Sequence, residues 1–289
     1  AFLLVYLLCI LLLGLPVMIT EFFIGRHTNR NAAGAFKELA PGTKWSLIGY
    51  NGVLAAFLIL GFYSVVAGWT LEYVLQAFSG SLSDKTATDF ATDFSNFSTG
   101  LIRPIIWTVT FIVLTHVIII SGVKSGIERA SKIMMPLLFL FLLILAIRSV
   151  TLPNASEGLT FLFQPDFSKI NSSVILSAMG QAFFSLSLGM GILITYASYY
   201  PKTTILSRTA VTVSLLDMTV AIMMGIIIFP AVTSFGLTGE SLEGPSLVFS
   251  TLPEVFAMMP LTQLWSSLFF LFLMVAALTS TISIAEVSI

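Results

Sequence analysis

The stretch Gly180-Gln-Ala-Phe-Phe-Ser-Leu-Ser-Leu-Gly-Met-Gly191 ends in two glycines separated by one residue, inside an apolar run over residues 174–199. A continuous helix over this run would be about 39 Å long, at about 1.5 Å per residue, whereas a bilayer core needs about 30 Å. Two half-helices joined at 189–191 therefore fit the thickness of the bilayer better than one continuous helix does. Backbone groups freed by such a break cost several kcal/mol in hydrocarbon unless they line a cavity or bind a ligand. The stretch therefore predicts a binding site near the membrane midplane.

The composition indicates an integral membrane protein. Of the 289 residues, 57% are hydrophobic and only 9% are charged, against about 25% charged residues in an ordinary soluble domain. Each apolar segment is near or above the ~20 residues that a spanning helix requires. The predicted spans are 1–25, 46–78, 102–121, 134–152, 174–199, 205–235 and 260–289. We expect an all-α, multi-pass protein of the plasma (inner) membrane that contacts the lipid bilayer.

Several function classes find no support in the sequence. The single cysteine, Cys9, allows neither a disulfide framework nor a cysteine-based metal site. A net charge of -1 without a long basic cluster leaves nucleic acid without a binding surface. There is no nucleophile elbow, phosphate loop or histidine-rich metal spacing, so we do not expect an enzyme.

The loop charges predict the orientation. Nine of the thirteen Lys and Arg residues fall in the alternate linkers 26–45, 122–133 and 200–208, which should be cytoplasmic by the positive-inside rule. The other linkers carry mainly acidic charge: 79–101, 153–173 and 236–259. These should face outside, and the last two should fold over an outer vestibule.

Four acidic residues lie within the predicted apolar spans: Glu21, Glu72, Asp217 and Glu286. An acid at mid-span, such as Asp217, costs about 2.5–3.5 kcal/mol on insertion scales, so it indicates a cation ligand or a proton carrier, or else a carboxylate paired with a neighbouring helix or headgroup. Glu21 precedes Arg26 by five residues, which fits an ion pair as well as a functional role. Glu72 lies near the outer end of its span, where we expect water to reach it.

Hydroxyl groups mark further candidate positions. Ser185 and Ser187 could simply bond to carbonyls one turn earlier in their helix, but the adjacent break favours a functional role. Ile59 and Tyr63 are four residues apart and share one helix face. A phenol there either finds a partner on a helix or binds a ligand.

The last span holds a cluster of oxygen atoms. Ala276, Ser280 and Ile284 recur at intervals of four residues and therefore lie on one helix face, with Thr279 beside them. Two neighbouring hydroxyls and a carbonyl suit an alkali cation.

These motifs, in this order, resemble the neurotransmitter:sodium symporter family, whose bacterial members carry amino acids, over all 289 residues. The opening stretch, followed by Thr195-Tyr-Ala-Ser-Tyr199, resembles the unwound helix 6 of the family. Ala276-Ala-Leu-Thr-Ser280 resembles helix 8. Gly14-Leu-Pro-Val-Met-Ile-Thr-Glu-Phe-Phe-Ile-Gly-Arg26 resembles the end of helix 2, and Gly122-Val-Lys-Ser-Gly-Ile-Glu-Arg129 the loop between helices 4 and 5.

The resemblance implies an inverted-repeat sodium symporter fold with a discontinuous helix. In that register the chain spans family helices 2 to 8, as one transmembrane domain fragment (1–289) without helix 1 and helices 9 to 12. Residues 1–152 would be the remainder of the first inverted repeat and 174–289 the first part of the second. A fragment of this kind is expected not to transport by itself.

The resemblance also implies roles for individual residues. Two sodium sites are expected in the complete protein, and their ligands in this chain are Ser185 and Asp217 at the first, and Ala276 (through its carbonyl), Thr279 and Ser280 at the second. Tyr63 matches the phenol that bonds to the substrate carboxylate, and Phe184 the aromatic ring that covers the substrate. The full set of implied substrate positions is Ile59, Tyr63, Phe184, Ser185, Ser187, Met190, Ser280 and Ile284.

Two departures from the family pattern refine the expected function. Chloride-dependent members have Asn at 217 and Ser four residues later, whereas this chain has Asp217 and Ala221. The fixed carboxylate can supply the charge that chloride gives its relatives, so we expect no chloride requirement. Met190 replaces a Phe found in many relatives, and a flexible thioether leaves a roomier pocket. We therefore expect sodium-coupled symport of large apolar or aromatic L-amino acids by alternating access.

Two alternatives stay open from the sequence. The chain could be a transport-inactive fragment of such a symporter. An ion channel also uses broken helices and buried acids, although no repeated filter loop is visible. The identity of the amino acid, the sodium stoichiometry, proton antiport and the oligomeric state are left open.

Overall fold

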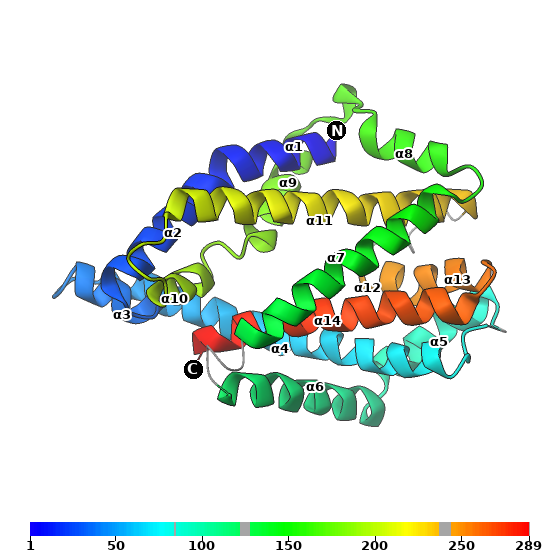
Figure 1. Ribbon diagram of the computed structural model, residues 1–289, viewed down its shortest axis with the longest axis horizontal. Coiled ribbons are helices and arrows are strands. Elements are labelled where there is room, and N and C mark those ends of the chain that lie inside the picture. The colour runs from blue at the N-terminus through cyan, green and yellow to red at the C-terminus, as the bar shows by residue number, and fades with distance from the viewer. Residues whose placement is uncertain (84, 122–127, 237–243, 289) are drawn as a thin grey trace. The chain divides into compact units, whose positions relative to one another are not determined.

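In the computed structural model, every regular element among the described residues, 1–83, 85–121, 128–236 and 244–288, is helical (Figure 1). This confirms the all-α prediction. The elements are α1 (Phe2–Cys9), η1 (Ile10–Gly14), α2 (Leu15–Thr28), α3 (Ala32–Leu39), α4 (Ser46–Phe78), α5 (Ala87–Thr99), α6 (Ile102–Ile120), α7 (Glu128–Val150), α8 (Ala155–Phe163), η3 (Phe167–Lys169), α9 (Ser172–Ser185), α10 (Ile192–Ser198), α11 (Leu206–Ser234), α12 (Gly244–Ser246), η5 (Leu247–Thr251), α13 (Leu252–Ala257) and α14 (Thr262–Ser288).

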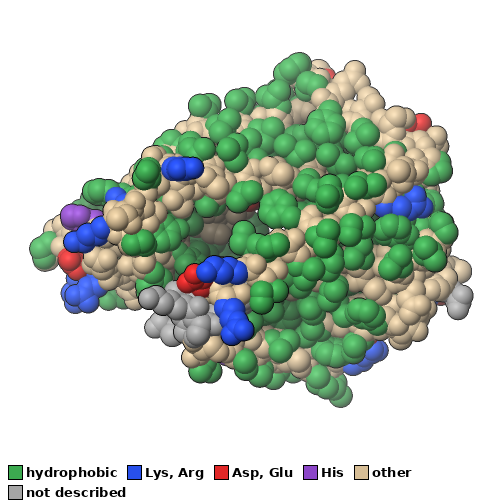
Figure 2. Space-filling view, viewed as in Figure 1, with side chains coloured by type: hydrophobic (Ala, Val, Ile, Leu, Met, Phe, Trp, Pro, Cys, Tyr) green, Lys and Arg blue, Asp and Glu red, His purple; other side chains and the backbone are tan. Residues whose placement is uncertain are grey.

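Within the described ranges, six helical stretches are long and apolar enough to cross a membrane. They are Phe2–Thr28, Ser46–Phe78, Ile102–Ile120, Ser131–Val150, Leu206–Ser234 and Thr262–Val287. The first combines α1, the π-helical turn η1 and α2 without interruption. Six of the seven predicted spans are thereby confirmed, and apolar side chains cover much of the visible face (Figure 2).

The seventh predicted span is broken, as the glycines indicated. α9 ends at Ser185 and α10 begins at Ile192, with an irregular segment between them (Figure 1). We call residues 186–191 the unwound segment. Ser187, Gly189 and Gly191 have φ angles of 56°, 75° and 74°. Glycine adopts such a left-handed conformation without steric cost, so the two glycines explain how the chain turns before α10 begins at Ile192.

Among the described residues, five α-helices lie inside the predicted linkers and were not predicted from the sequence: α3, α5, α8, α12 and α13. The polar linker 79–101 contains the 13-residue helix α5, which begins directly after Thr86. The carboxylate of Asp89 accepts the Thr86 N–H at 2.9 Å and its hydroxyl at 2.6 Å, and these bonds lower the pKa of Asp89. A Thr followed three residues later by an acid is a capping signal that could have predicted α5.

Parts of other linkers lie outside the described residues. These include Lys124, Glu240, Glu243 and most of the motif at 122–129. The predicted orientation of the loops in the membrane stays a prediction.

The chain forms two compact units, and each is described by itself. Unit 1 contains Ala1–Leu60, Phe163–Ile222 and Ser283–Ile289, and unit 2 contains Gly61–Leu162 and Met223–Ile282. Three long helices, α4, α11 and α14, contribute residues to both units. The division into two inverted repeats, 1–152 and 174–289, stays a prediction.

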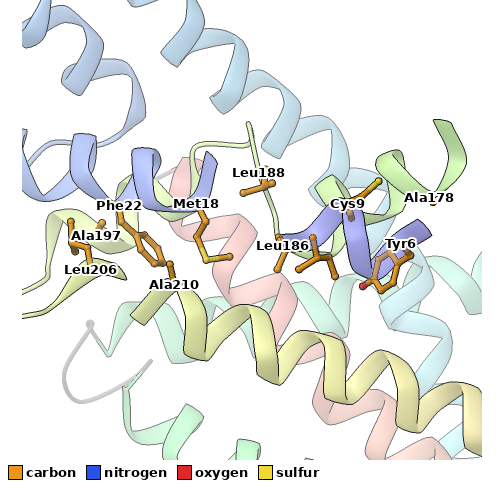
Figure 3. Close-up of a cluster of buried hydrophobic side chains, with 12 residues drawn as sticks. Tyr6, Cys9, Met18, Phe22, Ala178, Leu186, Leu188, Ala197, Leu206 and Ala210 are labelled. Atoms are coloured by element: carbon orange, nitrogen blue, oxygen red, sulfur yellow. The ribbon is translucent and has the colours of Figure 1, made fainter. Parts of the chain in front are cut away.

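The core of unit 1 includes two side chains of the unwound segment. Leu186 and Leu188 lie among side chains from the first span and from α11 (Figure 3). Small residues let the helices approach closely at this core. Its buried members are Tyr6, Cys9, Ile10, Met18, Phe22, Ala178, Ala182, Leu186, Leu188, Ala197, Leu206 and Ala210. Burial of both leucines fixes the path that the chain takes after α9.

The core of unit 2 joins α4, α6 and α14. Ala67, Phe111 and Ala277 are buried together, and the partly buried Tyr63 packs against them. Unit 2 thereby holds the second half of α4 and most of α14 as one packed group.

A close contact between α2 and α10 yields a stability prediction. A Cβ atom at Gly25 would overlap the carbonyl oxygen of Ile194 and lie 3.0 Å from the Cβ of Ala197. We expect Gly25→Ala to destabilise the protein by about 1–3 kcal/mol through overpacking, measured as a fall in the thermal unfolding midpoint in detergent. The control is Gly61→Ala, because nothing lies within 4 Å of a Cβ at Gly61. Equal shifts for both variants would contradict the close contact.

Candidate functional site

Three side chains from separate helices of unit 1 meet at Asp217. The hydroxyl of Ser185, at the end of α9, donates to Oδ1 of Asp217 at 2.5 Å. The hydroxyl of Tyr6, on α1, lies 3.2 Å from both Oδ2 of Asp217 and Oγ of Ser185. The resemblance implied that Ser185 lies beside Asp217, and the structure brings these two residues together within unit 1; their role as sodium ligands stays a prediction.

The electrostatics of this cluster favour a cation. Among the described residues, no Lys, Arg or His forms an ion pair with Asp217, and its partners there are two neutral hydroxyls. The last carbonyls of α9 add the partial negative charge of a helix C-terminus beside Ser185. An ionised acid within a membrane span needs a cation or a proton to offset its charge. The arrangement can therefore hold a small cation.

The unwound segment finds part of its hydrogen bonding on α2. The N–H of Gly189 donates to Oε1 of Glu21 at 2.7 Å. Glu21 is only 7% exposed, and its second oxygen has no hydrogen-bond partner in the part of the chain that the structure describes. Arg26 donates instead to the carbonyl of Thr204. The role left open for Glu21 is thus contact with the broken backbone.

The unwound segment also forms backbone hydrogen bonds to the end of α9 and approaches α3 and α4 closely. The N–H of Ser187 donates to the carbonyl of Phe184 at 3.1 Å, and that of Leu188 to Phe183 at 2.9 Å. A Cβ at Gly191 would lie 2.7 Å from the Cβ of Ala32 on α3, and one at Gly52 on α4 would lie 3.2 Å from the Gly189 carbonyl oxygen. Neighbouring helices therefore leave little room for side chains here.

The oxygen cluster predicted on the last span lies in unit 2. The hydroxyl of Thr279 donates to the carbonyl of Ala276 at 2.7 Å. The side chain of Ser280 lies near the phenol of Tyr63 on α4. Two residues that the sequence placed on different helices are thus neighbours within unit 2.

The remaining predicted positions also divide between the units. Within unit 1, Phe184 is half exposed and Ile284 is buried, at 50% and 7% exposure. Ile59, Ser187 and Met190 are partly exposed. Unit 1 thus holds Ile59, Phe184, Ser185, Ser187, Met190, Asp217 and Ile284, and unit 2 holds Tyr63, Ala276, Thr279 and Ser280.

The family of this chain is identified by comparing its sequence with known protein families. The sequence profile described as the sodium:neurotransmitter symporter family matches residues 1–99 and 90–289, which together cover the whole chain. The chain belongs to this family. The resemblance noted from the unwound motif is thereby confirmed, and so are the multi-pass membrane location and the symporter fold.

Relatives within the symporter family agree with this placement. The sodium-dependent transporter YhdH of Bacillus subtilis (strain 168), itself uncharacterized, is 42% identical over 99% of this chain and 63% of its own length. The sodium-dependent dopamine transporter of Bos taurus is 26% identical over 97% of this chain and 47% of its own. The crystal structure of MhsT in complex with L-phenylalanine is 48% identical, with a TM-score of 0.92, over 99% of this chain and 65% of that one.

The chain spans less than two thirds of the length of these proteins. Membership makes it part of a group of sodium-dependent transporters. The roles of individual site residues stay predictions.

Glu21 provides a test of how the unwound segment is held. We expect Glu21→Leu to leave the Gly189 N–H without its acceptor and to destabilise the fold by about 1–3 kcal/mol, and also to speed amide hydrogen exchange in the unwound segment. Glu21→Gln retains an oxygen acceptor for the Gly189 N–H and should therefore lose much less stability. The readouts are the thermal unfolding midpoint and exchange followed by mass spectrometry.

The matched control is Glu38→Leu, which removes an exposed carboxylate paired with Arg30 and should change little, as surface pairs do. Indistinguishable behaviour of the Leu and Gln variants at Glu21 would show that the bond to Gly189 has no role.

Proposed function

We propose that this chain is part of a sodium-coupled symporter of neutral amino acids that works by alternating access. The observation that carries the proposal is the Asp217 cluster: an acid in a membrane span, bonded to Ser185 at 2.5 Å where a broken helix ends. Family membership favours a transporter over the ion channel left open by the sequence, and over an enzyme.

The first sodium ion is proposed to bind Ser185 and Asp217. Their oxygens, together with the carbonyl end of α9, supply the negative potential that half-helix C-termini offer to sodium in secondary transporters. The hydroxyl of Tyr6 can hold the second carboxylate oxygen while the first binds the ion.

The second sodium ion is proposed to bind the carbonyl of Ala276 and the hydroxyls of Thr279 and Ser280. The distance of 2.7 Å from the Thr279 hydroxyl to the Ala276 carbonyl supports a compact pair of oxygen ligands on one helix face.

The proposed substrate is a large apolar or aromatic L-amino acid. Tyr63 would bond to its carboxylate and Phe184 would cover it, with Ile59, Ser187 and Met190 among the proposed contacts. The complete set of proposed substrate residues is Ile59, Tyr63, Phe184, Ser185, Ser187, Met190, Ser280 and Ile284. The relative MhsT, 48% identical, has been solved in complex with L-phenylalanine, which supports a substrate of this class.

Sodium entry provides enough energy for accumulation. Each ion moving down about 100 mV releases about 2.3 kcal/mol, which concentrates a neutral zwitterion roughly 50-fold. Two ions per cycle would therefore support steep uptake.

Chloride independence is proposed because Asp217 places a fixed negative charge where chloride-dependent relatives are expected to use the anion. We expect replacement of chloride by gluconate to leave sodium-dependent uptake by the intact protein within about twofold, since a pre-placed carboxylate needs no mobile counter-charge. Collapse of uptake in gluconate would overturn this proposal.

The matching variant test uses Asp217→Asn, which keeps the shape and removes the charge. We expect at least 10-fold more sodium to be needed for half-maximal amino-acid binding, equivalent to about 1.4 kcal/mol. Asp166→Asn is the control, because Asp166 is an exposed acid in a linker. Unchanged sodium dependence in the Asp217 variant would remove this residue from the sodium site.

Met190 allows the pocket size to be tested. We expect leucine, phenylalanine and tryptophan to compete with uptake better than glycine and alanine. Met190→Phe should weaken competition by tryptophan about fivefold more than competition by leucine, because a rigid ring fills space into which the flexible thioether can adapt. A preference for glycine or alanine, or equal losses for both large substrates, would contradict the proposed pocket.

A further inference from the structure

Unit 2 contains a cavity of about 630 Å³ that the proposed transport does not use. It lies where α4 ends, beside α5, and where α6 begins. The residues that line it include Lys85, Asp93, Asn96, Phe97, Leu101 and Arg103. Its lining thus combines charged, amide and apolar groups.

Two cations and one acid line the cavity. The ammonium of Lys85 lies 2.9 Å from the carboxylate of Asp93, and the Lys85 side chain is 22% exposed. Arg103 is 68% exposed, and its guanidinium lies 6.0 Å from the ring centre of Phe97. The charged lining therefore has an excess of one positive charge, with an acid close to a cation.

Arg103 is fixed in position by a buried acid. Nη2 of Arg103 donates to Oε1 of Glu72 at 2.5 Å, and Glu72 also accepts from Trp107 Nε1 at 2.6 Å and Gln76 Nε2 at 2.8 Å. The expectation that water reaches Glu72 is wrong, since its side chain is only 4% exposed. A guanidinium has five N–H donors, so an exposed Arg103 anchored through one nitrogen can bind an anion with the others.

The cavity adjoins an apolar surface. Leu101 and Ile102 line it and are 78% and 74% exposed, and the same helix continues with Ile105 and Val109, which are 57% and 54% exposed. Because α6 is a candidate membrane span, acyl chains can lie along this surface. A ligand with a charged head and apolar tails matches both parts.

We propose that this cavity binds the headgroup of a phospholipid that carries both a phosphate and a primary ammonium, as phosphatidylethanolamine does. Arg103 and Lys85 hold the phosphate, since charge-assisted bonds from cations to phosphate oxygens are strong. Asp93 and the side-chain oxygen of Asn96 accept the ammonium protons. A headgroup without an ammonium leaves Asp93 facing an anion, and a choline headgroup has no N–H to donate. The inference does not depend on the proposed substrate or ions.

Native mass spectrometry of the intact, delipidated protein tests the proposal, with phosphatidylethanolamine, phosphatidylglycerol or phosphatidylcholine of identical acyl chains added. We expect phosphatidylethanolamine to bind at least fivefold more tightly than the other two. Lys85→Gln should weaken it about 10-fold. The control Lys169→Gln removes a lysine that also pairs with an aspartate, Asp166 at 3.7 Å, but does not line the cavity, and it should have no effect.

A second variant keeps the test independent of folding. Asp93→Asn alters an exposed side chain and should remove the preference for phosphatidylethanolamine over phosphatidylglycerol while leaving the thermal unfolding midpoint unchanged. Soluble glycerophosphoethanolamine should compete for the site at millimolar concentration. Equal binding of the three lipids, loss in the Lys169 variant as large as in the Lys85 variant, or full competition by inorganic phosphate without lipid selectivity would each overturn the proposal.

Discussion

The structure of unit 1 depends on the hydrogen bond from the Gly189 N–H to Glu21, because this bond gives a partner to a backbone group that the helix break leaves exposed. A backbone that leaves its helix inside hydrocarbon must find partners outside that helix. Here a buried acid from the first span reaches across to the peptide group that the turn exposes. The leucines on either side of Ser187 are buried in the core of unit 1. Apolar packing of Leu188 and the hydrogen bond of Gly189 therefore stabilise adjacent residues. The break is therefore a stable part of the fold.

Three of the acids within the spans, Glu21, Glu72 and Asp217, are accommodated in different ways. Glu72 has a cationic partner in Arg103 together with two neutral donors. Glu21 accepts a peptide N–H, and Asp217 is bonded to two hydroxyls. A carboxylate whose described partners are neutral keeps most of its negative potential. This difference explains why Asp217 is proposed to bind an ion, whereas Glu72 is a structural group that orients an arginine.

Much of the fold followed from local signals in the sequence. Length and apolarity predicted the spans because a bilayer sets a minimum apolar length for every spanning helix, and the glycines at 189 and 191 indicated the break. The polar contacts were harder to foresee. The partner of Glu21 is 168 residues away in the chain and is a backbone group, which carries no side-chain signature. Two of the partners of Glu72, Arg103 and Trp107, likewise come from another helix. Ser185 and Asp217 were paired only through the resemblance, since spacing alone does not bring α9 to α11.

The contact at Gly25 has a mechanical consequence. α10 has seven residues, too few for a helix that must stand without support, and its backbone lies against that of α2 at Ile194. A displacement of α10 along or around its own axis would drive a carbonyl into the neighbouring helix. The end of the first span and α10 should accordingly move together as one rigid body.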